Sequence, residues 1–410
     1  MTPSTLTAEP VCPGAVRGSA RTATASTPTL KRPCAAFRRP FDSIPAELWD
    51  SLKGDTPSAT PFSSWAFQRA WWDAYGANAH DETLVVLPVD ATGAPVAGAD
   101  PIGIIPLMHR HEVEPSDEAG HTRMRLSADV EMTPVAPTAT AIFFGASYHA
   151  DYATILAAPA DLETVADALV DYLVSAGGPA WDVVDLRRLR CGDPAADALA
   201  AAFGRREAEA GWTLNLERED VCPVVTLPEG ADFEAVLGML GKKERHEIRR
   251  KLRRAESVGT VTLTRSPDPL ADLPEFIELH QKRWGDAGLF PETPGGAASR
   301  VFFRRLFELL GPKGPLVLSF LAVGERRIGA GVHLEDGPAL LYYNAGIDPE
   351  ARELSPGVLM VASYLEAAIA GGFRRMDFLR GDEPYKYEWG ARDEPIQRLL
   401  IRRTEGSMSR

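Results

Sequence analysis

The sequence is poor in the residues and runs that mark several common protein classes. Its 410 residues include four cysteines, which lie far apart and form no CxxC pair (Cys12, Cys34, Cys191 and Cys222). This usage fits a reducing cytosol better than a disulfide scaffold or a zinc site. No uninterrupted apolar run reaches the roughly 18 residues needed to cross a bilayer. We therefore expect no transmembrane segment.

Several catalytic signatures are absent as well. The chain has no GxSxG, GxxxxGK[ST] or HExxH motif, which removes the commonest hydrolase and nucleotide-hydrolysing classes. His109, His111 and His121 have no acidic ligands beside them, so we expect no metal site. The net charge of −13 argues against a general nucleic-acid binder but leaves room for a local basic patch.

Residues 1–40 differ from the rest of the chain. They are rich in Ser, Thr, Pro and Ala, with six basic residues and one acidic residue. Such a segment cannot bury enough apolar surface to fold alone, so we expect a disordered tail. It lacks the apolar core of a secretory signal, whereas a transit peptide or an over-extended start assignment would have a similar composition.

The remaining chain has a globular composition and nearly repeats itself. YLVSAGGPAWDVVDLRRLRCGDP begins at Tyr172 and YLEAAIAGGFRRMDFLRGDEP at Tyr364, an offset of 192 to 194 residues. Each is a helix end, an Ala-Gly-Gly stop, a strand and an Arg followed by Gly-Asp. A period of this length indicates a duplicated domain rather than a solenoid. We predict two α/β units with mixed sheets, at 41–222 (the first half) and 223–410 (the second half).

Helices and strands alternate in both halves. Ser63–Gly76 has helical spacing of apolar residues, with Ser63 as the expected N-cap and Gly76 as the stop. The second half has a helix ending in HQKRWGDAG, then a hairpin, PLVLSFLAVGERRIGAGVHLED, and the strand ALLYYNAGI. Arg283 and Trp284 end that helix, and an Arg there can pair with a carboxylate or phosphate.

The halves differ at one turn. In the second, the strand ALLYYNAGI leads through SPGV (Ser355–Val358) into a helix, whose N-terminus can hold a phosphate. SPGV is also compatible with ordinary helix capping, with Ser as cap and Pro in the first turn. The first half has Asp161 and Glu163 at the matching place, and these would repel an anion. We predict that only the second half binds a phosphate-bearing group.

The stretch MDFLRGDEPYKYEWG, residues 376–390, crowds acids, bases and aromatics at one strand end. We interpret it as the rim of an acyl-transfer site, with Tyr385 and Lys386 as its main candidates. Asp377 and Arg380 are equally compatible with a structural ion pair, and Trp389 with a core position.

A basic helix is predicted over residues 241–256, with eight bases and three acids. It fits a solvated helix face with Glu–Arg and Glu–Lys pairs. The alternative is an electrostatic arm for RNA or another polyanion, but few aromatics are interleaved for base stacking.

These motifs together resemble the GNAT acyltransferase superfamily, and more narrowly the tandem-GNAT group of CelD-like and FemAB-like proteins. The resemblance rests on FSSWAFQRAWWDAYG, KKERHEIRRKLRR, HQKRW and the run from YYNAGIDPEARELSPGVLM to GGFRRMDFLRGDEPYKYEWG, and it covers about residues 41–405. It implies two tandem GNAT-like domains, the first degenerate, in a bacterial cytoplasmic setting. It also implies splayed central strands that admit an acyl-CoA.

The resemblance implies roles for particular residues. The pyrophosphate turn maps onto Arg352, Ser355, Gly357 and Val358, although RELSPGV departs from the family pattern Q/R-x-x-G-x-G/A. Backbone N–H groups near Tyr343–Ala345 would stabilise the oxyanion. The catalytic candidates are Tyr385 as acid, Asp377 as base or amine-orienting group, and Lys386. The substrate-binding candidates are Arg283, Trp284, Tyr343, Asn344 and Arg380. Arg380 and Lys386 would hold an anionic group of the substrate or cofactor.

Three functions follow from these observations. The first is an acyl-CoA-dependent N-acyltransferase acting on an amine, such as that of an amino sugar or a cell-envelope precursor, without a metal. The second is a FemAB-like aminoacyltransferase that uses charged tRNA, which the basic helix favours. The third is a non-catalytic accessory protein of polysaccharide biosynthesis.

Overall fold

The computed structural model describes residues 33–110, 132–311 and 314–404. Most of the predicted tail lies outside this range, as do His111 and His121. The prediction of a tail up to residue 40 is wrong at its end, because Cys34–Arg38 form strand β1 and pair with β3 (Leu84–Pro88). Among the helices of the described residues, none combines the length and apolar character needed to cross a membrane.

The first half alternates short strands with helices. Its elements after β1 are α1 (Ala46–Gly54), α2 (Trp65–Tyr75), β2 (Ala79–Asp81), β3, β4 (Gly103–Ile105), β5 (Leu107–Arg110), β6 (Ala141–Phe144), β7 (Leu156–Ala157), α4 (Leu162–Val174), β8 (Val183–Arg190), α5 (Pro194–Ala210) and β9 (Trp212–Thr226).

The second half begins with two helices and then follows the predicted order. Its elements are α6 (Phe233–Gly238), α7 (Lys242–Glu256), β10 (Val261–Arg265), α8 (Pro269–Trp284), α9 (Pro294–Leu310), β11 (Leu316–Val323), β12 (Arg326–Asp336), β13 (Ala339–Ile347), the 3-10 segment η5 (Pro349–Leu354), α10 (Pro356–Ala370), β14 (Arg375–Asp377), α11 (Pro384–Glu388) and β15 (Arg392–Arg403).

Local chemistry explains where these elements begin. The predicted hairpin is β11–β12, and ALLYYNAGI is β13 along its whole length. Helix α2 begins one residue later than expected: Ser64, not Ser63, is its N-cap, and the Ser64 hydroxyl accepts a hydrogen bond from the Phe67 N–H at 3.2 Å. Such a cap satisfies one of the unpaired donors of the first turn.

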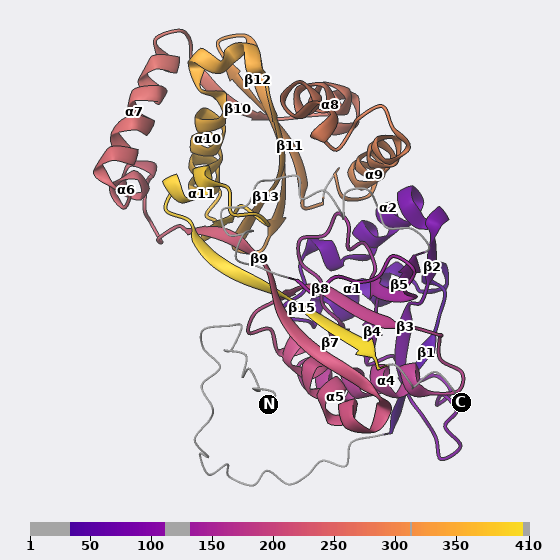
Figure 1. Ribbon diagram of the computed structural model, residues 1–410. Helices are drawn as coiled ribbons and strands as arrows, with labels where there is room; N and C mark the ends of the chain where they lie inside the picture. Colours follow the sequence, from indigo (N-terminus) through magenta and orange to yellow (C-terminus); the bar gives the residue numbers. More distant parts are fainter. Residues whose placement is uncertain (1–32, 111–131, 312–313, 405–410) are drawn as a thin grey trace, which may run out of the picture.

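One sheet runs through both halves. It has eleven strands in the order β10-β11-β12-β13-β14-β9-β15-β8-β6-β5-β2, and a second sheet has the order β1-β3-β4-β7. In the second half α10 covers one face of the large sheet, with α7 packed outside it, and α8 and α9 cover the other (Figure 1). The mixed α/β architecture predicted from the sequence is confirmed.

The last strands of the two halves are exchanged. β9, from the first half, pairs with β14, and β15, from the second half, pairs with β8. The two long strands also pair with each other, from Arg392 opposite Val224 to Arg403 opposite Trp212. They cross between the halves at the centre of the molecule (Figure 1). The predicted boundary at residues 222/223 therefore lies inside β9.

The duplication is visible in the crossovers. β6 runs parallel to β8 with α4 between them in the chain, and β13 runs parallel to β14 with α10 between them. Parallel neighbours need such a crossover helix. The two halves therefore share a strand–helix–strand unit with one exchanged strand beside it.

Aromatic side chains join the two halves on the face of the large sheet that α8 and α9 cover. Helix α2 packs against α9, and Phe67 meets Phe302 edge-on with ring centroids 5.4 Å apart. His149 stacks on Phe302 at 4.1 Å, and its Nε2 lies 2.8 Å from the Tyr75 hydroxyl. Full burial of one such aromatic ring is worth about 2–3 kcal/mol, so this contact fixes the halves firmly.

Candidate active site

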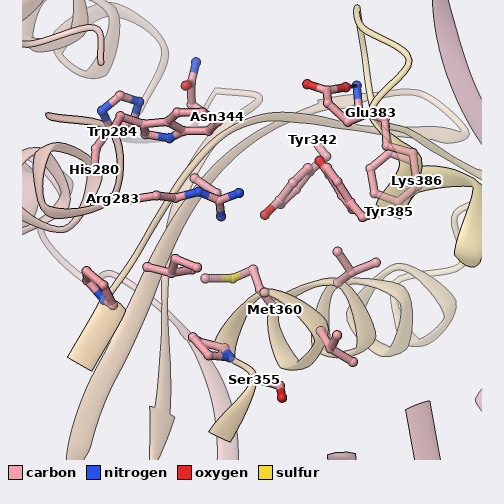
Figure 2. A pocket seen from close by; sticks show the side chains of 18 of the residues that line it. His280, Arg283, Trp284, Tyr342, Asn344, Ser355, Met360, Glu383, Tyr385 and Lys386 are labelled. Atoms are coloured by element: carbon pink, nitrogen blue, oxygen red, sulfur yellow. Dashed lines mark ion pairs between the residues drawn. The ribbon is translucent and has the colours of Figure 1, made fainter. Parts of the chain in front are cut away.

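A cavity opens in the second half where two parallel strands separate. β13 and β14 pair only over Ala339–Leu341 and Arg375–Asp377, after which β14 ends and β13 continues. The cavity has a volume of about 520 Å³ and lies between the end of α8, the start of α10 and α11 (Figure 2). Splayed strands at this place are what the GNAT resemblance implies.

Nearly all of the predicted site residues line this cavity. They are Arg283, Trp284, Tyr343, Asn344, Arg352, Ser355, Gly357, Val358, Arg380, Tyr385 and Lys386. They come from five segments of the second half that lie up to about a hundred residues apart in the chain. Asp377 is the exception, since it does not line the cavity.

The start of α10 forms the positive end of the cavity. Ser355 has a left-handed backbone (φ 57°, ψ 55°), and its side chain does not cap the helix. A non-glycine residue in this conformation costs roughly 1 kcal/mol, and such strain clusters at ligand-binding turns. A Cβ added to Gly357 would meet nothing within 4 Å, so the turn has open space in front of it. Arg352 lies on η5 just before this turn and is exposed.

Strand β13 is irregular beside the cavity. Val332 of β12 is opposite Asn344 and His333 is opposite Tyr342, so Tyr343 is an extra residue in a bulge. A bulge interrupts the ladder and redirects backbone groups. The Tyr343 hydroxyl donates a hydrogen bond to the carbonyl of His149 at 2.9 Å, so it is already engaged with the first half.

Two tyrosines face the middle of the cavity. The side chains of Tyr342 and Tyr385 lie close together between Arg283 on one side and Glu383 on the other (Figure 2). Burial raises the pKa of Tyr385 well above its usual range, and the neighbouring Tyr342 and Glu383 raise it further. The phenol therefore stays protonated at neutral pH and can donate a hydrogen bond or a proton.

The structure gives Asp377 a different environment from the predicted one. Its carboxylate is buried and accepts hydrogen bonds from the Tyr152 hydroxyl and the Leu379 N–H, both at 2.8 Å. Burial raises its pKa, although these hydrogen bonds act in the opposite direction. The contact with Tyr152 ties it to the first half, which argues against its predicted role as a base.

Arg380 and Lys386 line the cavity but are already engaged. A structural ion pair of Asp377 with Arg380, one of the two interpretations that the sequence leaves open, is not formed, because Arg380 instead lies 3.2 Å from the carboxylate of Asp151. The Lys386 ammonium is buried among backbone carbonyls and forms an ion pair with Glu383. Both cations therefore shape the turn before α11, and the structure does not favour their predicted role as anion binders.

Sequence reasoning missed four lining residues that Figure 2 labels: His280, Tyr342, Met360 and Glu383. A signal existed for Tyr342, because strand alternation puts it on the face opposite Tyr343. Glu383 lies inside the quoted motif but had no visible partner. His280 and Met360 read as core residues on helices, and only tertiary packing brings them to the cavity. The described residues hold no cluster of three or more His, Cys, Asp or Glu that could bind a metal ion.

Comparison with known proteins finds one family model that matches part of the second half. Residues 242–387, from α7 to α11, match a family model described as an acetyltransferase (GNAT) domain. This segment of the second half is similar to GNAT domains, and it makes up less than half of the chain. The predicted relation to the GNAT superfamily is thereby confirmed, and it supports an acyltransferase in general terms.

Several solved structures are similar to this chain at low sequence identity, and of the three named here only FemX has a TM-score above 0.5. FemX is 12% identical, with a TM-score of 0.53 over 86% of this chain and 96% of FemX. L-PGS from Bacillus licheniformis is 9% identical, with a TM-score of 0.47 over 89% and 93% of the two chains. A tandem GNAT protein from the clavulanic acid biosynthesis pathway is 12% identical, with a TM-score of 0.41 over 90% and 98%. At this identity the likeness to FemX concerns the fold alone. No curated protein sequence matches the chain.

Proposed function

We propose that the protein is an acyl-CoA-dependent N-acyltransferase, using acetyl-CoA or another acyl-CoA, that acylates a primary amine such as that of an amino sugar or a cell-envelope precursor. The observation that carries this proposal is the cavity between β13 and β14, with a helix N-terminus at one end and a tyrosine hydroxyl in the middle. A cytoplasmic location stays a prediction.

The residues at the start of α10 fit the donor's pyrophosphate. The first helical turn presents N–H groups and a positive dipole end to an anion. The Ser355 hydroxyl, which does not cap the helix, and the Arg352 guanidinium add hydrogen-bond donors there. Gly357 leaves room for the phosphates. The pattern RELSPGV has one glycine where the family usually has two, so the open space at Gly357 is the main support for this fit.

The cavity also supplies groups that acyl transfer needs. The bulged backbone of β13 at Tyr343 can aim N–H groups at the developing oxyanion. As the C–N bond forms and the C–S bond breaks, the Tyr385 hydroxyl gives its proton to the departing sulfur and regains one from the new amide nitrogen. Overall, the entering ammonium and the thioester are therefore converted into an amide, a free thiol and one released proton.

One observation favours a second candidate, transfer from an aminoacyl-tRNA. Helix α7 is exposed on its basic face and packs beside η5, which borders the phosphate-binding turn. A polyanionic donor could follow this helix into the cavity. A non-catalytic accessory role is the outcome if neither donor binds.

Tyr385→Phe tests the proposed chemistry. We expect turnover with acetyl-CoA and an acceptor amine to fall about 100-fold, because loss of a positioned proton donor typically costs 10²–10⁴. Acetyl-CoA affinity, measured by calorimetry, should change less than threefold. Tyr387→Phe is the control, because Tyr387 lies on the same helix and its hydroxyl bonds to Asp393 outside the cavity. Equal losses of turnover and affinity in Tyr385→Phe would count against the assignment.

A further inference from the structure

The ammonium group of Lys386 sits in a cage of oxygen atoms. It donates hydrogen bonds to the carbonyls of Leu379 at 3.2 Å, Arg380 at 3.0 Å and Gly381 at 2.8 Å. A carboxylate oxygen of Glu383, Oε2, lies 2.8 Å from the same nitrogen. The Lys386 residue is only 2% exposed. A buried ammonium with this many partners is fixed in position and fixes its partners in turn.

The backbone of the turn is shaped around this ammonium. Leu379 and Gly381 both have positive φ angles, 57° and 105°, which point successive carbonyls inward. Between them, the Arg380 side chain leaves the turn and reaches Asp151 of the first half. The turn is therefore held from both sides, and a left-handed Leu379 is retained at a cost of roughly 1 kcal/mol.

Glu383 is the member of this cage that faces the cavity. Its side chain is 22% exposed and lines the cavity with its carboxylate near Tyr342 and Tyr385 (Figure 2). Oε2 forms the ion pair with Lys386 but receives no hydrogen bond, and no hydrogen-bond donor within the described parts of the chain contacts Oε1 either. Lys386 has three protons for four oxygen partners, so it cannot saturate the carboxylate.

The surroundings of Glu383 suit a cation. Phe378 lies edge-on to both Tyr342 and Tyr385, with ring centroids 6.0 Å apart in each pair. Aromatic faces next to one carboxylate are a setting that attracts an ammonium group. Glu388, the last residue of α11, also lines the cavity, but it is exposed and forms no ion pair among the described residues.

We propose that Glu383 binds the acceptor: its Oε1 contacts the ammonium group of the primary amine substrate and takes a proton from it. Lys386 is a positioning residue that holds the Glu383 carboxylate through Oε2. This assignment rests on the proposed acyl transfer. The first proton of the ammonium passes to Glu383 and then to water, which leaves a neutral nitrogen to attack the thioester carbon. The second nitrogen proton follows the departing sulfur through Tyr385.

Glu383→Gln is the direct test, because the amide keeps the shape and removes the charge. The probes are acetyl-CoA and a panel of primary amines that includes glucosamine and 1,4-diaminobutane, with free thiol as the readout. We expect kcat/KM for the amine to fall at least about 100-fold, while acetyl-CoA binding by calorimetry stays within twofold. Glu366→Gln, an exposed charge on α10 away from the cavity, is the matched control.

The outcomes separate the two proposals. If wild type binds and consumes acetyl-CoA, and Glu383→Gln keeps kcat/KM within threefold, the acceptor site is wrong and the proposed function stands. If wild type binds no acetyl-CoA, the proposed function falls and this assignment with it.

A double-mutant cycle tests the role of Lys386. If Lys386 acts through Glu383, then Lys386→Met lowers amine kcat/KM, and the double variant with Glu383→Gln is no worse than Glu383→Gln alone. A merely structural role would make the two losses multiply. Thermal unfolding identifies a single variant that fails to fold. The double variant buries no unpaired charge, so its kcat/KM still shows whether the two losses multiply.

Discussion

Asp220 is a buried acid at the junction of the two halves. It lies on β9, is 5% exposed, and has the charged groups of Arg380, Arg188 and Asp151 around it. Burial raises its pKa to about 6, even though Arg380 and the Val221 N–H lower it. The folded protein therefore binds this proton more tightly than the unfolded chain, whose Asp groups titrate near 4.

The raised pKa predicts how stability depends on pH. The stabilising contribution is complete below about pH 4 and is lost as the pH rises through about 6, for a total of about 3 kcal/mol. Asp220→Asn removes it, so in urea unfolding the variant should gain on wild type between pH 4.5 and 7.5. Asp55→Asn, at an exposed helix end, is the control for the Asp-to-Asn substitution itself. If the unfolding free energy of Asp220→Asn followed the same pH dependence as that of wild type, the prediction would be contradicted.

The candidate site shows which residues a sequence can indicate. Tyr385, Lys386 and Gly357 sit in contiguous motifs whose local chemistry is visible, and all three line the cavity. The residues that contact these motifs in the fold cannot be predicted in the same way. Asp377 bonds to Tyr152, 225 positions away, and nothing in a single sequence indicates that contact. The roles of Asp377 and Lys386 were therefore open until tertiary structure supplied their partners.

Among the elements, α7 separates the two candidate donors. Its apolar face, with Ile248, Leu252 and Ala255, packs into the core of the second half. Its other face exposes bases that form no ion pair in the part of the chain that the structure describes; these are Lys242, Lys243, Arg253 and Arg254. A helix this basic on a protein of net charge −13 concentrates positive potential beside η5.

Replacing these four bases with Gln tests what α7 contributes. If the donor is acyl-CoA held at the start of α10, transfer from acetyl-CoA should change less than threefold. If the donor is a charged tRNA, its affinity should fall at least 30-fold and its salt dependence should weaken, since several phosphate contacts are lost. Gel-shift titrations with tRNA and turnover with acetyl-CoA distinguish the two. Arg205→Gln with Arg206→Gln on α5 is the control for a general change of charge.

At the scale of the whole molecule, the exchanged strands make each half incomplete. Without β15, β8 would lose its antiparallel neighbour, and without β9, β14 would lose its own. Unpaired strand edges expose backbone donors and acceptors and promote aggregation. The sequence predicted the duplication from its repeat but not the exchange, because either neighbouring sheet edge satisfies the same alternation of side chains.

This topology predicts the behaviour of separated halves. A chain cut in the loop after β9, between Leu227 and Asp232, should give two fragments that are insoluble when expressed singly. Expressed together, they should co-purify as a folded complex, because β9 and β15 pair along nearly their whole length. Co-purification through a tag on one fragment measures this. A second fragment that folds and stays monomeric alone would contradict the account.

The central claim is that an acyl-CoA binds in the second half, with its pyrophosphate at the start of α10. Acetyl-CoA binding should be measured by calorimetry on wild type, Gly357→Glu and Gly357→Gln. A side chain fits at this position without a clash, and an acid in the first turn does not destabilise the helix. We expect wild type to bind, and we expect Gly357→Glu to bind at least tenfold more weakly than Gly357→Gln, or by about 1.4 kcal/mol, because the two side chains fill the same space and only Glu repels the phosphates. Equal binding by Gly357→Glu, or no binding by wild type, would contradict the account.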